Sequence, residues 1–490
     1  MAHLFPKELE TARQQAKEQA RALRALALPP DQSLEAKPRP SPLPASVQSD
    51  PVQENEVPTG DPAWWGIAEI AAAYRSGLAS PALVVDALLE RIERLQPELA
   101  AFVHLDADGA RNVARNCDLP RGPLYGIPVA IKDVIDVAGM PTTCHSRLRL
   151  GHVARRDAPT VAALRGAGAI VLGKLATHEF AIGGPAFDLP FPPARNPWNK
   201  QHHPGGSSSG AGAAVAAGLV PLALGTDTAG SVRNPASACG IVGIKPSRGL
   251  FSCEGVVPLA WSLDHVGLLA RSVADATIGL GAFAPSRHPN GDPKIGYIRH
   301  FHTVDMSATP EMAAALDRVA ATLGASECQL PPLDHFALVN RVILQCEGAT
   351  YHADDLRLRP DWFSRRTRAA LQPGLFISAE EYIYARRAQA MLSDTVEKLF
   401  RQFDVLVCAS SMMPACALDD DEAIDATYMK QARTVFNLTG HPALAMMAGL
   451  SAAGLPLSVQ FAARNGDEAT LLAVAARWEH AMGGPQHPAI

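Results

Sequence analysis

Two glycine-rich loops that carry serine hydroxyls are the segments of this sequence best suited to chemistry. The first is GGSSSG at 205–210, and the second holds Ser231 within GTDTAGSVRNP. Glycine lets the backbone adopt positive φ or approach another group closely, so we expect both loops to be tightly shaped. A serine hydroxyl is a weak nucleophile until a base takes its proton. The sequence must therefore supply a base as well.

Lys132 is a candidate for that base. It follows the apolar run IPVAI at 127–131, which indicates a buried strand. Burial can lower the pKa of a lysine by about 3 to 5 units, which makes the neutral amine available near neutral pH. A second interpretation stays open, in which Lys132 is a solvated strand-end lysine or the ion-pair partner of Asp133 or Asp136.

The order of the predicted strands and helices that must position these residues indicates an α/β protein. Short apolar runs alternate with helical patterns along the chain, which favours a largely buried, mixed sheet. We expect strands within 126–137, 169–174, 240–246, 294–298, 404–408 and 457–461, and helices at 81–95, 159–168, 310–323, 379–400 and 468–481. There is no internal repeat.

The first 62 residues differ from the rest. Apolar residues three and four apart predict an amphipathic helix over 7–28, ended by Pro29 and Pro30. A proline-rich tract then continues to Pro62, and its lack of apolar residues is typical of a linker or of an arm laid over a surface. We therefore divide the chain into an N-terminal helix and arm, 1–62, and a catalytic domain, 63–490.

Composition excludes several classes of protein. The 490 residues are 47% hydrophobic and 19% charged, with a net charge of −5 and no basic patch, so we expect no nucleic-acid partner. Eight scattered cysteines lack zinc-site spacing and are expected to be reduced. The start MAHLFPKELE is a poor secretory signal, and the apolar stretch 211–224 contains Pro221 and is too short for a membrane span. These features predict a cytoplasmic protein without a membrane partner.

One short motif is misleading. Residues 206–210 fit the pattern G-x-S-x-G, which would make Ser208 the nucleophile of a hydrolase elbow. That elbow needs a strand directly before it, whereas Pro204 precedes this loop. His202 and His203 lie nearby in sequence, and we interpret them as loop histidines.

Two glycine patterns are weak hints of nucleotide binding. Residues 168–174 resemble a phosphate loop, but Leu175 stands where a magnesium-binding hydroxyl belongs. Gly210 and Gly212 begin a dinucleotide-like pattern, but Val215 replaces its last small residue. We expect no nucleotide site.

The whole constellation resembles the amidase signature family of serine hydrolases. The resemblance rests on GGSSSG, then GTDTAGSVR at 225–233, then GIKP at 243–246. Further matches lie in the family's order at GIPVAIKD, NPWN, SLDHVG, FDVLV, FNLTGHPAL, GLPLSVQ and DEATLL. The resemblance covers residues 63–481 and implies an α/β fold with a large mixed central β-sheet covered by helices on both faces.

The resemblance also implies roles for single residues. Ser231 is similar to the family's nucleophile, Ser207 to its bridging serine and Lys132 to its catalytic lysine. Lys132 would take the proton of Ser231 by way of Ser207. In the family the bridging serine follows a cis peptide bond, so we expect one between Gly206 and Ser207.

The same resemblance places an oxyanion hole after Asp227. Backbone N–H groups of Thr228, Ala229, Gly230 and Ser231 would hold the charge of the tetrahedral intermediate. Ala229 departs from the family's usual glycine, which restricts φ at this point. We expect Asp227 and Arg233 to brace the loop through charge-assisted hydrogen bonds.

The resemblance implies hydrolysis of a carbon–nitrogen amide bond through an acyl-enzyme on Ser231, with esters or carbamates as further substrates and no metal or organic cofactor. The alternative is the glutaminase-type subunit of a tRNA-dependent amidotransferase. A third interpretation is a binding protein that retains the fold without its activity. We expect a small-molecule substrate, a pocket formed by loops 178–191 and parts of 330–430, and an arm that covers the catalytic domain or a homodimer interface.

Overall fold

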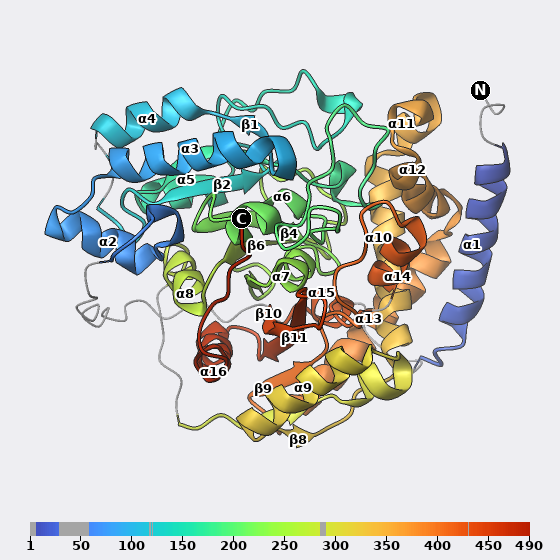
Figure 1. Cartoon of the computed structure of the whole chain (residues 1–490). Coiled ribbons are helices and arrows are strands. Elements are labelled where there is room, and N and C mark those ends of the chain that lie inside the picture. The colour runs from blue at the N-terminus through green and yellow to red at the C-terminus, as the bar shows by residue number, and fades with distance from the viewer. Residues whose placement is uncertain (1–5, 29–57, 117–118, 120, 285–290, 430) are drawn as a thin grey trace.

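The computed structural model describes residues 6–28, 58–116, 119, 121–284, 291–429 and 431–490. One mixed sheet dominates these residues. Its strands are β1 (Phe102–Leu105), β2 (Pro128–Lys132), β3 (Ile170–Leu175), β4 (Leu222–Asp227), β5 (Val242–Lys245), β6 (His265–Ala270), β7 (Ile295–Tyr297), β8 (Ser326–Glu327), β9 (Val405–Cys408), β10 (Ala443–Leu450) and β11 (Pro456–Ala463). Figure 1 shows the sheet crossing the molecule.

The strand order is β1-β3-β2-β4-β6-β5-β10-β11-β9-β7-β8. β2 runs parallel to β3 and β4, and β7 runs parallel to β8 and β9. The other neighbouring strands are antiparallel. The predicted fold class, a large mixed sheet within an α/β protein, is confirmed.

The described residues also form α-helices on both faces of the sheet and at its edges. They are α1 (Pro6–Arg24), α2 (Ile67–Ser76), α3 (Pro81–Leu99), α4 (Ala107–Asn116), α5 (Pro159–Gly166), α6 (Ser209–Ala216), α7 (Arg233–Cys239), α8 (Val273–Gly281), α9 (Pro310–Leu323), α10 (Leu333–Tyr351), α11 (Ala353–Leu358), α12 (Arg365–Leu371), α13 (Ala379–Leu399), α14 (Asp421–Met429), α15 (Thr434–Thr439) and α16 (Glu468–Ala481). A short 3₁₀ helix, η6 (Gln372–Phe376), follows α12.

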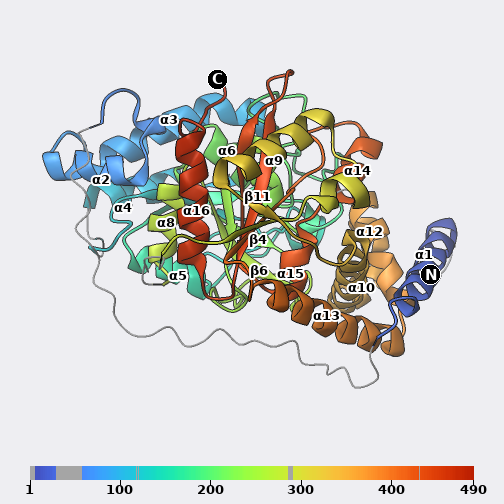
Figure 2. The same ribbon diagram turned by 90° about the horizontal axis from the view of Figure 1, so that it is seen from below.

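The two faces of the sheet carry separate hydrophobic cores. Alternate side chains of a strand point to opposite faces, so Val129 and Ile131 of β2 lie in one core and Ala130 in the other. Helices α3, α4, α6 and α7 cover the face of Ala130, and α8, α9 and α16 cover the opposite face (Figures 1 and 2). Lys132, two residues beyond Ala130, therefore points toward α6.

Helix α1 lies apart from the other N-terminal elements. It packs on η6, α10 and α13 at one side of the molecule, whereas α2 lies at the opposite side (Figures 1 and 2). The helix predicted for 7–28 exists but ends at Arg24, and Ala27 adopts a left-handed φ of 44° that no helix continues. The proline-rich tract lies mainly outside the described residues. Within the described ranges, no helix has the length and apolar character needed to cross a membrane.

Candidate active site

Lys132 ends β2 deep inside the molecule. It is fully buried, and its Nζ donates to Ser207 Oγ and to Thr226 Oγ1, both at 2.8 Å. Burial lowers the pKa of Lys132 to about 7, because the ammonium loses its hydration there. The interpretation of Lys132 as a solvated lysine is therefore wrong. The ion pair with Asp133 is also absent from the described residues, since Asp133 pairs with Lys174 at 3.1 Å.

The loop that carries Ser207 is pressed against His178. The Gly206–Ser207 peptide bond is cis, as expected. The backbone N–H of His178 donates to the carbonyl oxygen of Ser207 at 3.1 Å. A Cβ atom at position 206 would overlap the His178 ring. Only glycine leaves room for the ring at this point.

Ser231 lies just before α7, close to the start of α6. The N–H of Ser208 donates to the carbonyl oxygen of Ser231 at 3.2 Å, which ties the two serine loops together. A Cβ atom at Gly212 of α6 would lie 2.7 Å from Cβ of Pro235 in α7, so glycine lets these helices pack closely. Ser231 is partly exposed, whereas Ser207 and Ser208 are buried. Of the three serines, only Ser231 is partly accessible to solvent.

The backbone after Asp227 offers donors for an oxyanion. The N–H of Gly230 is already taken, because it donates to Asp227 Oδ1 at 2.8 Å. Within the described part of the chain, the N–H groups of Ala229 and Ser231 have no acceptor. The φ angle of Ala229 is not in the left-handed region, so an alanine fits at this position without backbone strain.

Asp227 and Arg233 form a buried ion pair behind this loop. Arg233 Nε donates to Asp227 Oδ2 at 3.0 Å, and Nη2 donates to Oδ1 at 2.9 Å. Burial opposes ionisation of Asp227, but the guanidinium outweighs it and holds the pKa of the carboxyl well below its ordinary value. Asp227 also accepts from the N–H of Val232 at 3.1 Å. The pair fixes the backbone on both sides of Ser231.

A second carboxylate, Asp264, holds the same loop from the other side. Thr228 Oγ1 donates to Asp264 Oδ1 at 2.6 Å, and the N–H groups of Leu259 and Ala260 donate to Asp264 Oδ2. Burial raises the pKa of Asp264 to about 6. Its charge also acts on Lys132, favouring the ammonium. Asp264 thus has two effects: it holds the predicted oxyanion loop through Thr228, and its charge raises the pKa of Lys132.

Two buried histidine rings and the partly buried ring of Tyr428 lie beside the Ser207 loop. His178 and His203 approach at 3.4 Å between their Nε2 atoms, and the Tyr428 hydroxyl lies 3.5 Å from each ring. Burial lowers the pKa of His203 to about 3 and that of His178 well below its ordinary value. The cluster is therefore polar but uncharged. His203, interpreted from sequence as a loop histidine, is instead part of the site's interior.

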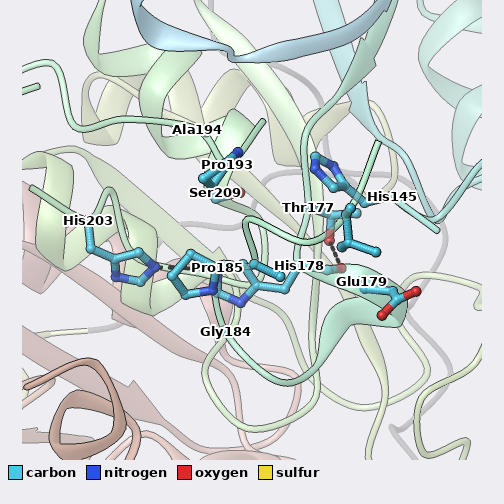
Figure 3. Close-up of a pocket in the computed structure, with 12 residues that line it drawn as sticks. His145, Thr177, His178, Glu179, Gly184, Pro185, Pro193, Ala194, His203 and Ser209 are labelled. Carbon is cyan, nitrogen blue, oxygen red and sulfur yellow. Dashed lines mark hydrogen bonds between the residues drawn. The ribbon is translucent and has the colours of Figure 1, made fainter. Parts of the chain in front are cut away.

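A small pocket that is partly open to solvent adjoins this cluster (Figure 3). Figure 3 shows His178 and His203 on one side of it and His145 and Glu179 on the other. Residues of the loop predicted from 178 to 191 line the pocket, including Pro185. The pocket lies next to the Ser207 loop and does not include Ser231 or Lys132 among its lining residues.

The structure thus brings together Lys132, Ser207, Thr226 and the loop of Ser231. Sequence reasoning missed Thr226, Asp264, His203 and Tyr428. Thr226 lies within GTDTAGS and Asp264 within SLDHVG, two segments that were singled out without assigning these side chains. Tyr428 had no local signal, because only the folded chain brings it to His178.

Comparisons with known proteins find related sequences along most of the chain. The family model Amidase matches residues 83–472. A curated relative, a glutamyl-tRNA(Gln) amidotransferase subunit of Roseiflexus sp. (strain RS-1), is 35% identical over 465 residues, covering 83% of this chain and 94% of that protein.

Solved structures extend the likeness to the fold. A structure described as a vestigial protein complex that reveals the origins of an s-triazine catabolic enzyme is 31% identical, with a TM-score of 0.80, over 86% of this chain and 99% of the other. A 6-aminohexanoate cyclic dimer hydrolase with its substrate is 27% identical, with a TM-score of 0.78, over 87% of this chain and 99% of the other.

Proposed function

This chain belongs to the amidase signature family, and from that premise we propose that it hydrolyses a carbon–nitrogen amide bond through an acyl-enzyme on Ser231. The observation that carries the proposal is the contact of 2.8 Å between Lys132 Nζ and Ser207 Oγ in a buried site. A lysine with a pKa of about 7 can exchange protons at neutral pH, and Ser207 is the group to which it would pass them.

The proposed reaction has two stages. In the first, Ser231 Oγ attacks the amide carbonyl carbon, its proton moves to Ser207, and the proton of Ser207 moves to Lys132. The N–H groups of Ala229 and Ser231 stabilise the oxyanion. Lys132 then returns a proton through Ser207 to the leaving nitrogen, and the carbon–nitrogen bond breaks.

In the second stage, water attacks the acyl ester. Lys132 accepts a proton from the water by way of Ser207, and the second tetrahedral intermediate collapses with release of the acid and of Ser231. Each proton taken up by the lysine is given back within the same stage. No metal or organic cofactor takes part in these steps.

Replacement of Ser231 tests the assignment, with Ser208 as the matched control. Ser208 is the nucleophile that the short elbow motif would choose, but its Oγ is buried and lies 3.3 Å from the Thr226 carbonyl oxygen. We expect Ser231→Ala to abolish amide hydrolysis and labelling by a fluorophosphonate, and Ser208→Ala to keep both. Full hydrolysis by Ser231→Ala would overturn the proposal.

The curated relative favours a particular form of this chemistry. That protein is named as one subunit of a glutamyl-tRNA(Gln) amidotransferase, so we propose as the second candidate a glutaminase-type subunit that works with partner subunits. Its chemistry at Ser231 would be the same, with ammonia as the leaving group. The 6-aminohexanoate cyclic dimer hydrolase, by contrast, favours a hydrolase whose substrate is itself a small amide.

Assays of the purified chain separate the two candidates. The panel is glutamine, short aliphatic amides, aryl amides, fatty amides, a carbamate and an ester. Turnover of simple amides without a partner supports the stand-alone amidase. Two results together support the amidotransferase candidate. The purified chain is labelled at Ser231 but turns over no amide, and glutamine is hydrolysed only by a complex isolated from the source cells. Ester and carbamate hydrolysis, a homodimer and a cytoplasmic location stay predictions.

A further inference from the structure

Helix α1 contacts the rest of the protein through a narrow stripe of small side chains. Ala12, Ala16, Ala20 and Leu23, spaced by four, four and three residues, are buried, and most of the remaining surface of the helix is exposed. The stripe lies on η6, α10 and α13. Three alanines and one leucine bury little apolar surface, so this contact is weak for a helix of 19 residues. The main packing contacts of α1 are with these helices and not with the strands of the sheet.

One ion pair connects α1 with α12. Glu8 receives two hydrogen bonds from Arg368, from Nε to Oε2 at 2.8 Å and from Nη2 to Oε1 at 3.2 Å. Arg368 is 6% exposed and the Glu8 side chain is 33% exposed, so the pair is partly shielded from solvent. The other charged contacts of α1 are weaker, since Arg24 lies 3.7 Å from Glu380 with both side chains exposed. Glu8 is therefore the main polar anchor of the helix.

The N-terminal end of α12 contacts the pocket wall from behind, because its cap Ser364 binds Glu179, which lines the pocket. The N–H of Ser364, which caps α12, donates to Glu179 Oε2 at 2.7 Å, and Ser146 Oγ donates to Oε1 at 2.6 Å. Glu179 lines the pocket and directly follows His178 (Figure 3). A Cβ atom at Gly183 would lie 2.8 Å from the N atom of Thr367, so the loop after Glu179 also packs tightly on α12.

From these contacts we infer that residues 6–24 form a docking arm that positions α12 and, through Ser364 and Glu179, the pocket wall. The surface over η6, α10, α12 and α13 takes a helix with an alanine stripe and an acidic residue near its N-terminus, and α1 of this chain is its occupant. Only the catalytic readout of this inference rests on the proposed function.

Dislodging the arm in the full-length chain tests the docking. Ala16→Asp places a charge in the buried stripe, and Ala22→Asp places the same charge on an exposed position of the same helix. We expect Ala16→Asp to raise amide hydrogen exchange about tenfold or more in residues 6–24 and also in residues 364–371. Ala22→Asp should leave exchange unchanged in both segments.

A charge exchange tests the role of the ion pair. Glu8→Arg and Arg368→Glu each place like charges together, and the double variant restores an opposite pair. Glu10→Gln is the control, because Glu10 is exposed and contacts only Arg13 among the described residues. The readout is the kinetics of Ser231 labelling by an alkyl fluorophosphonate. We expect each single variant to raise KI about fivefold at unchanged maximal rate, and the double variant to recover.

The outcomes separate the docking arm from a general effect on stability. A fall in maximal rate at constant KI, or no recovery in the double variant, overturns the positioning role. Faster exchange in residues 6–24 without any change in residues 364–371 overturns the coupling through α12. If the wild-type chain is not labelled at Ser231, the proposed function fails, whereas the exchange experiment still decides whether the arm positions α12.

Discussion

Lys132 Nζ and Ser207 Oγ lie 2.8 Å apart in a site where both side chains are buried. The next residue along the chain, Asp133, does not neutralise Lys132, because Asp133 is occupied by Lys174 and by Thr143. The lysine therefore has hydroxyl partners, and its pKa is determined mainly by loss of hydration.

Activity should rise with pH through about 7, where the pKa of Lys132 lies. The ammonium form cannot accept a proton, so kcat/KM should be low below this value and reach a plateau above it. Initial rates of amide hydrolysis across a pH series check this expectation. An activity that falls as pH rises through 7 would contradict the role of Lys132 as a base.

Lys132→Met is the companion variant. It keeps the length of the side chain but removes the base, so kcat should fall by about 100-fold or more. Its folding stability should behave differently. The folded pKa, about 7, lies below the ordinary value of 10.5, so the unfolded chain binds more protons between these values. Stability of the wild type should thus rise with pH across this window, and urea titrations of Lys132→Met should show a smaller rise.

Asp264→Asn should lower kcat about tenfold or more and leave KM nearly unchanged, because it weakens the bond that fixes Thr228 without touching the pocket. Asparagine keeps the shape but loses the charge and one acceptor oxygen. Thr228→Val removes the other partner of the same bond. If the two act through one contact, the double variant should be no worse than the more damaging single variant. Strictly additive losses would show that Asp264 acts through another route.

The sequence predicted the fold class and several of the buried strands, for a physical reason. Buried strands such as 128–132 and 170–175 are nearly continuous apolar runs, and the glycine loops have few conformations compatible with their spacing. These are local signals. The N-terminal end of α3 was also predicted correctly, because Ser80 is a favourable cap and Pro81 is favourable in the first turn.

Contacts between distant segments could not be predicted in this way. Tyr428 reaches His178 across 250 positions, and Glu8 reaches Arg368 across 360. No periodicity or capping rule links such residues, since their proximity depends on how whole helices pack. The N–H group of Gly230, which the sequence analysis included among the oxyanion donors, donates to the Asp227 side chain instead. This contact could not be predicted either, because the sequence does not reveal that the Asp227 side chain folds back onto this N–H.

Gly206→Ala should damage both folding and labelling, because its Cβ would overlap the His178 ring. Overpacking of this kind costs about 1 to 3 kcal/mol and should displace the loop that carries Ser207. Urea unfolding and fluorophosphonate labelling measure the two effects. Gly166→Ala is the control, since that glycine has open space around its Cβ position. Adding His178→Ala to Gly206→Ala should recover part of the lost stability. Without any recovery, the His178 ring is not the cause of the requirement for glycine.

Arg233→Met should be among the most destabilising single changes in this chain. It leaves Asp227 buried without its guanidinium partner, and breaking a buried pair in this way costs about 3 to 5 kcal/mol. Arg233 also donates to Gln460 Oε1 at 2.6 Å, so a further acceptor loses its partner. The free energy of unfolding from urea titration checks the size of the loss. The double variant Asp227→Asn with Arg233→Met removes the unpaired charge as well and should be more stable than Arg233→Met alone. A double variant that is less stable than either single variant would mean that the carboxylate braces the Ser231 loop mainly through its backbone donors, at Gly230 and Val232, and not through the arginine.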